Sequence, residues 1–381
     1  MPEAMTLWPA KSHTLAKIEI LRAYQGAWCA IFAQSQHAQG QDLLYVDGFA
    51  GPGRYSNGHE GSPIVAMKTF IGLSNQLKSK GQWRAGKLRC VFIETNKDSA
   101  EYLRGLLTTM CKNDGDVIWQ VEHGTFATVF PKLEGELPSV YAAGSPILLF
   151  LDPFGAKGVP FSLIESVLSR PRCELLLNFD HDGYARISRA GASANAQQPL
   201  TLGLGGAAWQ STLIRKSFSE QCDAVLKFYK QNLLSIPRVD FVTSFQMQTP
   251  KKSFSSVGYS LVFASQSPRG LEKMKGAMKV IAQDGHFQFS NAYRGQLTLF
   301  RFDDPAFHAE LLYEAFAGKQ ASLSELNQFA LIETPFTNAK AMLKYLDIAN
   351  RITVNSTDPK RRKGTFSNST TSITFNARGP L

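Results

Sequence analysis

The sequence predicts an α/β fold built on a doubly wound, mostly parallel sheet, and three observations support this prediction. Short apolar runs alternate with stretches of helical periodicity between positions 43 and 179. The apolar runs are nearly continuous, which is typical of parallel strands that are covered on both faces. Polar motifs follow four of these runs, at the strand ends where ligands bind in doubly wound sheets.

The expected elements begin with a helix over residues 11–32, where apolar side chains recur near the 3.6-residue period. Ser62 and Pro63 are typical of a helix N-cap and first turn, and Asp98 is a candidate cap for a later helix. Two strands after the fifth bring the expected Rossmann-like sheet to seven. The predicted strands are 43–46, 88–93, 117–121, 147–151, 174–179, 239–247 and 257–264, and the predicted helices are 62–78, 98–110, 161–169 and 270–283.

Residues 182–220 interrupt this rhythm. They are rich in Ala, Gly, Ser and Gln, so we expect an insertion that lies over the ligand site. The segment 202–206 is expected to be flexible, and the insertion could act as a lid.

The C-terminal part predicts a second, smaller domain. Helical patterns at 323–329 and 338–346 precede short strands near 351–353 and 373–375. Two short helices and a basic hairpin are the outline of a winged helix, whose basic side chains contact phosphates. We therefore predict an α/β domain at 1–300 and a winged-helix domain at 301–381. The candidate nucleic-acid-binding residues are Lys360, Arg361, Arg362 and Lys363.

The composition is that of a folded, basic protein. Of 381 residues, 44% are hydrophobic and 19% are charged, which excludes a mainly disordered chain. Lys and Arg number 41 against 31 Asp and Glu, a formal net charge of +10. This charge favours a polyanionic partner such as nucleic acid, although a basic enzyme with a small substrate stays open.

Other sequence features indicate where the protein works. No apolar run reaches the roughly 18–20 residues of a membrane span, and the N-terminus lacks the pattern of a secretory signal. The five cysteines are odd in number and far apart, without Cys-x-x-Cys, and the seven histidines form no HxxxH pair. These patterns predict a cytoplasmic protein with neither a disulfide framework nor a metal site.

The first polar motif is Asp47 with the glycine-rich turn that follows it, in the segment DGFAGPG at 47–53. Glycines at Gly48, Gly51 and Gly53 let a nucleotide-like ligand approach the backbone. A carboxylate here suits a cationic ligand, such as the amino acid part of S-adenosylmethionine (SAM), and would repel a pyrophosphate. A tight turn without a ligand is the structural alternative.

Two further strand ends complete the candidate cofactor site. Glu94 ends the second predicted strand and could accept hydrogen bonds from both hydroxyls of a ribose. After the third strand, Thr125 lies where a side chain could bind the adenine amine, and Phe126 could cover the adenine ring. An exposed turn is the alternative at each position.

The motif with the clearest chemistry is LDPFG at 151–155. Asp152 could accept a hydrogen bond from an exocyclic amine, and the backbone carbonyl of Pro153 could accept another. Phe154 could stack on a base pulled from its helix. Because two acceptors would aim the amine at the methyl donor, catalysis would come mostly from positioning. A plain strand-to-helix turn is the alternative.

Polar residues also follow the fifth predicted strand. Any of them could orient a substrate or accept a proton, and a solvated turn is equally consistent with the pattern. These residues are Asn178, Asp180, His181 and Asp182.

These segments resemble a known family. DGFAGPGRY at 47–55, GSP at 61–63, FIE at 92–94, LDPFG at 151–155 and YSLVFAS at 259–265 are similar to the bacterial three-Cys-motif partner proteins (TcmP). The likeness covers most of the first 290 residues, and the C-terminal part resembles the winged-helix domain of such proteins. It implies a methyltransferase-like Rossmann domain and a partner with a three-cysteine, radical-SAM-like motif, which this chain itself lacks.

The DGFAGPGRY and DPFG segments are also similar to RNA methyltransferases that act on base amines, namely adenine-N6 rRNA enzymes and tRNA guanine-N2 dimethyltransferases. The commoner Asp-Pro-Pro-Tyr motif has a second proline that is missing here. The shape of the pocket and the target base are therefore left open by the sequence.

Two functions remain in view. The first is a SAM-dependent methyltransferase that acts on an exocyclic base amine of nucleic acid, which the acidic residues Asp47, Glu94 and Asp152 favour. The second is a catalytically inactive, nucleic-acid-binding partner protein with a methyltransferase fold, which Thr125 and the missing proline favour. A small-molecule methyltransferase would have no use for the basic tail.

Overall fold

The computed structural model describes residues 7–112, 115–142, 144–155, 158–189, 194–212, 216–251, 254–281, 288–290 and 304–377. Internal contacts divide the chain into two compact units. The first comprises Met1–Ala277 with Phe289–Arg294, and the second comprises Met278–Gln288 with Gly295–Leu381. The predicted domain boundary at residue 300 lies outside the described residues.

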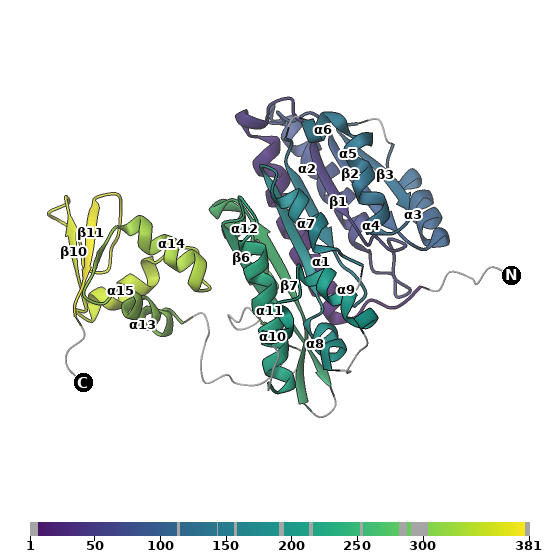
Figure 1. Ribbon diagram of the computed structural model, residues 1–381. Coiled ribbons are helices and arrows are strands. Elements are labelled where there is room, and N and C mark those ends of the chain that lie inside the picture. The colour runs from purple at the N-terminus through teal and green to yellow at the C-terminus, as the bar shows by residue number, and fades with distance from the viewer. Residues whose placement is uncertain are drawn as a thin grey trace. The chain divides into compact units, whose positions relative to one another are not determined.

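A mixed sheet with the strand order β3-β2-β1-β4-β5-β7-β6-β8 forms the centre of the first unit (Figure 1). The first five strands in this order are parallel, and β7 runs antiparallel to both β5 and β6. The predicted α/β class with a doubly wound, mostly parallel sheet is confirmed, and the three-residue β8 adds to the seven expected strands. The strands are β1 (Leu43–Asp47), β2 (Leu88–Glu94), β3 (Val117–His123), β4 (Ile147–Leu151), β5 (Cys173–Phe179), β6 (Phe241–Lys251), β7 (Phe254–Ser265) and β8 (Gln288–Ser290).

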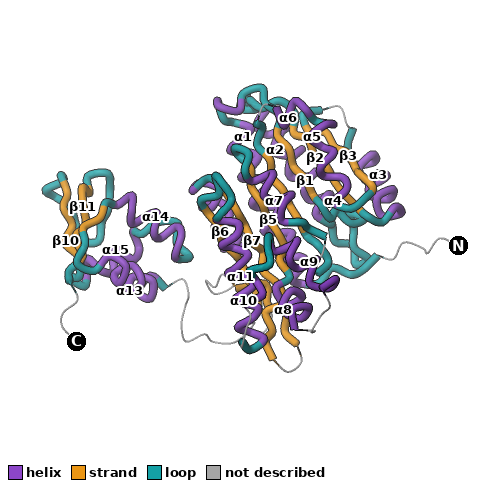
Figure 2. The backbone as a smooth tube through the Cα atoms, in the orientation of Figure 1, coloured by secondary structure: helices purple, strands orange, loops and turns teal. Residues whose placement is uncertain are grey.

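Helices alternate with the parallel strands, as Figure 2 shows by colour. Two caps differ from the prediction. Ser62 is the first residue of α2 and Gly61 takes the N-cap position, while Asn96 instead of Asp98 caps α3 by accepting a hydrogen bond from the Ser99 amide at 2.9 Å. The helices of this unit are α1 (Ser12–Ala33), α2 (Ser62–Ser79), α3 (Lys97–Met110), α4 (Phe126–Val129), α5 (Leu133–Glu136), α6 (Pro138–Ala142), α7 (Phe161–Leu168), α8 (His181–Arg189), α9 (Ala194–Leu204), α10 (Trp209–Thr212), α11 (Phe218–Leu234) and α12 (Pro268–Ile281), of which the residues from Met278 onward belong to the second unit.

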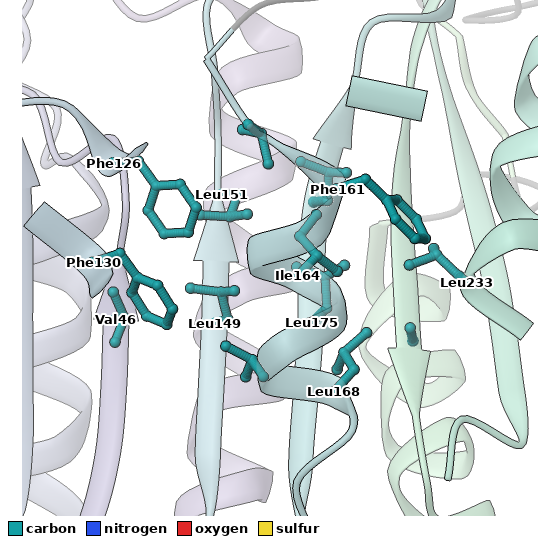
Figure 3. Packing of buried hydrophobic residues seen from close by; sticks show 14 of the residues in the cluster. Val46, Phe126, Phe130, Leu149, Leu151, Phe161, Ile164, Leu168, Leu175 and Leu233 are labelled. Carbon is teal, nitrogen blue, oxygen red and sulfur yellow. The ribbon is translucent and has the colours of Figure 1, made fainter. Parts of the chain in front are cut away.

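Both faces of the sheet are covered, which explains the continuous apolar runs. Because successive side chains of a strand point to opposite faces, Val46 packs with Phe126 and Phe130 on one side (Figure 3). Its neighbour Tyr45 packs edge-on against Phe70 of α2 on the other side. All five residues of β1 and of β4 are buried, so only the strand ends are open to polar chemistry.

Where the structure describes it, the predicted insertion at 182–220 is largely helical, with a turn at 205–208. It contains α8, α9, α10 and the start of α11. Leu200, Leu204 and Trp209 belong to the main hydrophobic core and are at most 3% exposed. Within the segment 202–206, Leu204 is buried in the core whereas Leu202 is 55% exposed, and the expected flexibility of this segment stays a prediction.

The second unit combines three helices with a three-stranded antiparallel sheet of order β10-β11-β9. The two predicted helices and two predicted strands are present, and α13 and β9 are additional elements. A separate core of apolar residues, including Leu312, Leu343 and Phe375, holds the unit together. Its elements are α13 (Pro305–Phe316), β9 (Gln320–Ala321), α14 (Leu323–Glu333), α15 (Lys340–Ile348), β10 (Ile352–Ser356) and β11 (Thr370–Phe375).

Among the described residues, no helix has both the length and the apolar character needed to cross a lipid bilayer.

Candidate functional site

The candidate site lies where the strand order of the sheet reverses. The chain passes from β1 outward to β2 and β3, and it then returns to β4 on the other side of β1. The carboxyl ends of β1 and β4 therefore diverge at this point, which is where ligands bind in open α/β sheets. The amide of Gly48 still donates to the carbonyl of Phe150 at 2.9 Å, so the turn after β1 leaves the sheet beside Asp152.

Asp47, the last residue of β1, is fully buried. Its Oδ1 accepts a hydrogen bond from the Phe49 amide at 3.2 Å, whereas Oδ2 is buried without a hydrogen-bond partner among the described residues. Burial raises the pKa of Asp47 to about 7, although hydrogen bonds from the Ser62 side chain and the Phe49 amide oppose this rise; the charges of Asp152 and Glu94 add to it by a smaller amount. An orphan acceptor of this kind is what an ammonium group would satisfy.

The turn after Asp47 requires glycine at three positions for different reasons. A Cβ at Gly48 would come within 2.5 Å of Leu151 and 2.8 Å of Phe126, so the turn packs directly against β4 and α4. Gly51 has φ +62°, and a Cβ there would meet nothing within 4 Å. The backbone at Gly51 is therefore left-handed, and space is open beside it. Gly53 also has a positive φ, but Leu103 and Ile64 fill the space beside it.

Glu94 connects this turn to the next strand. Its Oε2 accepts a hydrogen bond from the Gly51 amide at 2.8 Å, and its Oε1 accepts one from the Asn96 amide at 2.7 Å. The carboxylate thus fixes the glycine turn, a role that the sequence did not reveal. Since each carboxylate oxygen has two lone pairs, Glu94 keeps the capacity to accept further hydrogen bonds.

Thr125 and Phe126 lie in different surroundings although they are adjacent in sequence. Thr125 is exposed and caps α4 by accepting a hydrogen bond from the Thr128 amide at 3.2 Å. Phe126 is 1% exposed and stacks on Phe130 with ring centres 4.9 Å apart. Figure 3 shows the ring directed at Leu151. The Phe126 ring therefore packs against the glycine turn and within the core. The predicted role of covering an adenine ring does not fit this position.

Asp152 follows β4 and is held by two partners. The Lys17 ammonium donates a hydrogen bond to Oδ2 and forms an ion pair with it, and Asn178 Nδ2 donates to Oδ1 at 2.8 Å. The side chain of Lys17 is only 8% exposed and that of Asp152 is 24% exposed, so the pair is poorly screened by water. Lys17, on the apolar helix α1, was missed because no pattern in the sequence connects it to the end of β4.

Aromatic residues surround this ion pair. Lys17 Nζ lies 5.9 Å from the centre of the Tyr259 ring, and His13 meets the same ring edge-on at 5.7 Å. Burial, followed by the charges of Lys17 and Lys11, lowers the pKa of His13. The Tyr259 hydroxyl has no hydrogen-bond partner among the described residues, and burial raises its pKa well above the ordinary value. The Tyr259 hydroxyl is thus a neutral hydrogen-bond donor, and this hydroxyl and the His13 ring are acceptors beside Asp152.

Pro153 and Phe154 follow Asp152 but differ in exposure. Pro153 is buried and lines a small cavity with Asn178 and Asp180. Phe154 is 100% exposed, so its ring is available to a planar ligand without any rearrangement of the core. Asp180 accepts a hydrogen bond from the Gly183 amide at 2.9 Å and so stabilises the start of α8.

The four basic residues predicted to bind nucleic acid, at positions 360–363, have different environments. Lys360 and Arg362 are exposed. The Arg361 guanidinium donates to the Asp347 carboxylate and to the Thr365 carbonyl, and it lies over the Phe366 ring.

Arg361 therefore fixes the loop between β10 and β11, and we no longer assign it a phosphate contact. Lys363 donates to Asn350 Oδ1 at the end of α15. The exposed side chains of Lys360, Arg362 and Lys363 remain as the candidates for binding phosphate.

No family model matches this chain, and no curated protein matches it. Two solved structures are similar in part. A protein from Staphylococcus aureus, provisionally described as a caffeoyl-CoA O-methyltransferase, is 12% identical with a TM-score of 0.31, over 68% of this chain and 86% of that one. A loganic acid methyltransferase with SAH is 9% identical with a TM-score of 0.27, over 75% of this chain and 71% of that one. Both scores are low, so the proposals below are based on this chain's own residues.

The raised pKa of Asp47 predicts a specific dependence of stability on pH. An aspartate in an unfolded chain titrates near pH 4, whereas Asp47 titrates at about 7 in the folded protein. Between these values the folded state binds a proton that the unfolded state has released, so this group lowers the free energy of unfolding as pH rises. Asp47→Asn should remove that contribution, and urea unfolding between pH 5 and 7.5 would measure it.

The exposed Asp98 provides the matched control for this experiment. Asp98→Asn should follow the parent protein at every pH, while Asp47→Asn should show a flatter dependence. Equal slopes for the parent and Asp47→Asn would show that Asp47 does not titrate in this range.

Proposed function

We propose that the first unit is a SAM-dependent methyltransferase and that its acceptor is an exocyclic amine of a nucleic-acid base. The observation that carries this proposal is the meeting of Asp47, the open backbone of Gly51 and Asp152 at the reversal of the sheet. When bound, SAM supplies an electrophilic methyl group on a sulfonium centre.

The residues on the β1 side fit such a cofactor. Asp47 Oδ2 is an unpartnered acceptor, and it suits the ammonium of the amino acid part. Glu94 keeps lone pairs for ribose hydroxyls while it holds the Gly51 amide. The exposed hydroxyl of Thr125 suits a polar edge of the adenine.

The residues on the β4 side fit an amine acceptor. Lys17 and Asn178 fix both oxygens of Asp152, and each oxygen retains a lone pair that can accept a hydrogen bond from the amine. The amine is a weak nucleophile because its lone pair is delocalised into the base, so its geometry must be fixed. The exposed ring of Phe154 offers a face on which the base can stack.

A second candidate function is a binding protein that has lost turnover. The specific observation in its favour is that Asp152 and Glu94 each already accept hydrogen bonds on both oxygens within the protein. We further propose, on the resemblance to TcmP proteins, a partner with a three-Cys, radical-SAM-like motif. Either candidate retains a nucleic-acid ligand.

The second unit supports the nucleic-acid ligand. Its order of elements, α13-β9-α14-α15-β10-β11 with β11 in the centre of the sheet, agrees with a winged helix, and we propose that it is one. Exposed residues of α15 include Lys340, Lys344 and Tyr345. Together with Lys360 and Arg362 they provide charge and an aromatic face for binding a polynucleotide.

Methyl transfer tests the proposed reaction directly. The parent protein should transfer labelled methyl from SAM to cellular RNA or DNA, and nucleoside analysis should find it on an exocyclic amine. Removal of a preorganised electrostatic partner costs about 10²–10³ in rate, so Asp152→Ala should be nearly inactive. Asp152→Asn keeps one acceptor and should be impaired less.

Phe154→Leu separates substrate binding from folding, because the ring is fully exposed. It should weaken binding of the polynucleotide by about 1–3 kcal/mol and leave SAM affinity unchanged.

A methyl group on ring carbon, ribose or protein would contradict the role of Asp152, as would full turnover by Asp152→Ala. Binding of SAM and polynucleotide without any transfer would favour the second candidate.

The basic loop gives a prediction about salt. Replacement of both Lys360 and Arg362 by Ala should weaken polynucleotide binding and make its dependence on salt shallower by roughly one to two units of slope. The matched control replaces the exposed Lys80 and Lys97 of the first unit, which should change neither quantity by as much. Equal losses in both double variants would assign the effect to net charge alone.

A further inference from the structure

Three side chains that commonly bind metals meet outside the candidate methyl-transfer site. His181 and Asp182 begin α8, and Cys222 lies in the first turns of α11. The two helices lie side by side on one face of the sheet (Figure 1). The three residues are 1%, 5% and 5% exposed. One potential ligand atom from each lies within 4.8 Å of the other two.

The histidine is the unusual member of this cluster. Both ring nitrogens of His181 are buried, and neither has a hydrogen-bond partner among the described residues. Buried polar atoms are almost always satisfied, and an imidazole needs one donor and one acceptor contact when it is neutral. Nδ1 lies 3.6 Å from Asp182 Oδ1, which is beyond hydrogen-bond range but is aimed at the cluster.

Two of the three separations between the ligand atoms agree with a shared cation. Asp182 Oδ1 is 3.3 Å from Cys222 Sγ and 3.6 Å from His181 Nδ1. In a tetrahedral zinc site with bonds of about 2.0–2.3 Å, the ligand atoms are separated by roughly 3.3–3.7 Å. These two separations therefore need almost no adjustment to hold such an ion.

We propose that His181, Asp182 and Cys222 form a binding site for a divalent transition-metal ion, with Zn²⁺ as the fitting ion. A nitrogen, a carboxylate oxygen and a thiolate sulfur together suit zinc better than magnesium or calcium, which prefer oxygen alone. A thiolate and a carboxylate also balance the two charges of the ion, so no net charge is buried. That balance offsets the unfavourable position of a cation at the start of a helix.

All three ligands are almost inaccessible to solvent, and they supply three of the four positions that are filled around a tetrahedral zinc ion. The metal connects the start of α8, directly after β5, to α11. It thereby holds the helix that follows Asn178 and Asp180. These ligands could not be recognised in the sequence, because Cys222 lies 40 positions after Asp182 and the three residues match no ligand spacing. The sequence had predicted no metal.

Metal analysis of the full-length protein tests the proposal without any assumption about methyl transfer. Protein produced with zinc in the medium should contain about one metal ion per chain. After the metal is removed and Co²⁺ is added, a tetrahedral visible spectrum and a thiolate-to-cobalt band in the near ultraviolet should appear. Loss of the metal should lower the Tm.

Cys222→Ser should abolish the thiolate band and weaken Co²⁺ binding at least tenfold. Cys29→Ser, which changes a buried cysteine on α1, should keep both. If Cys222→Ser does not fold, His181→Gln and the spectrum of the parent protein decide the matter. A parent protein that binds neither Zn²⁺ nor Co²⁺ in stoichiometric amount, or that binds Co²⁺ without a thiolate band, overturns the proposal.

Discussion

The carboxylate of Asp47 is fully buried at the point where the strand order reverses. The arrangement of the candidate site depends on this burial. A buried charge without a partner is costly, so the group titrates near neutral pH and one oxygen remains unsatisfied. The strand cannot move Asp47 to solvent, because every other residue of β1 is buried between two layers of helices. The glycine turn that follows Asp47 is held by Glu94 and by the close approach of Gly48 to Leu151.

The ion pair between Lys17 and Asp152 lies at the end of β4, the strand beside β1. Its Coulombic attraction is strengthened by partial burial, and Asn178 completes the hydrogen bonds of the carboxylate. Burial is the main cause of the raised pKa of Asp47, and the negative charges of Asp152 and Glu94 across the reversal add a smaller contribution. A cationic ligand would relieve this repulsion. This electrostatic demand is one physical argument for the SAM site that we propose here.

Much of the fold could be predicted from the sequence because its signals are local. Continuous apolar runs such as residues 147–151 are buried strands, and their ends placed Asp47, Glu94 and Asp152 at one edge of the sheet. The packing of 182–220 could not be predicted, because its Ala- and Gly-rich composition resembles a loop while Leu204 and Trp209 bury in the core. Phe126 was misassigned for a related reason, since an aromatic residue at a strand end can face either ligand or core.

What the sequence could not provide was contact between distant segments. Lys17 meets Asp152 across 135 positions, and Cys222 meets Asp182 across 40. Neither pair forms a motif along the chain. In the sequence, Arg361 likewise cannot be distinguished from its three basic neighbours. In the structure its guanidinium donates a hydrogen bond to the Asp347 carboxylate.

Calorimetric titration with SAM tests the central claim most directly, because it requires no knowledge of the nucleic-acid substrate. The account predicts saturable binding by the parent protein. It also predicts a loss of about tenfold or more in Glu94→Ala, since hydrogen bonds to charged groups contribute about 1.5–3 kcal/mol each. Circular dichroism would confirm that the variant is folded. Absence of SAM binding by the parent protein, or an unchanged affinity in folded Glu94→Ala, would contradict it.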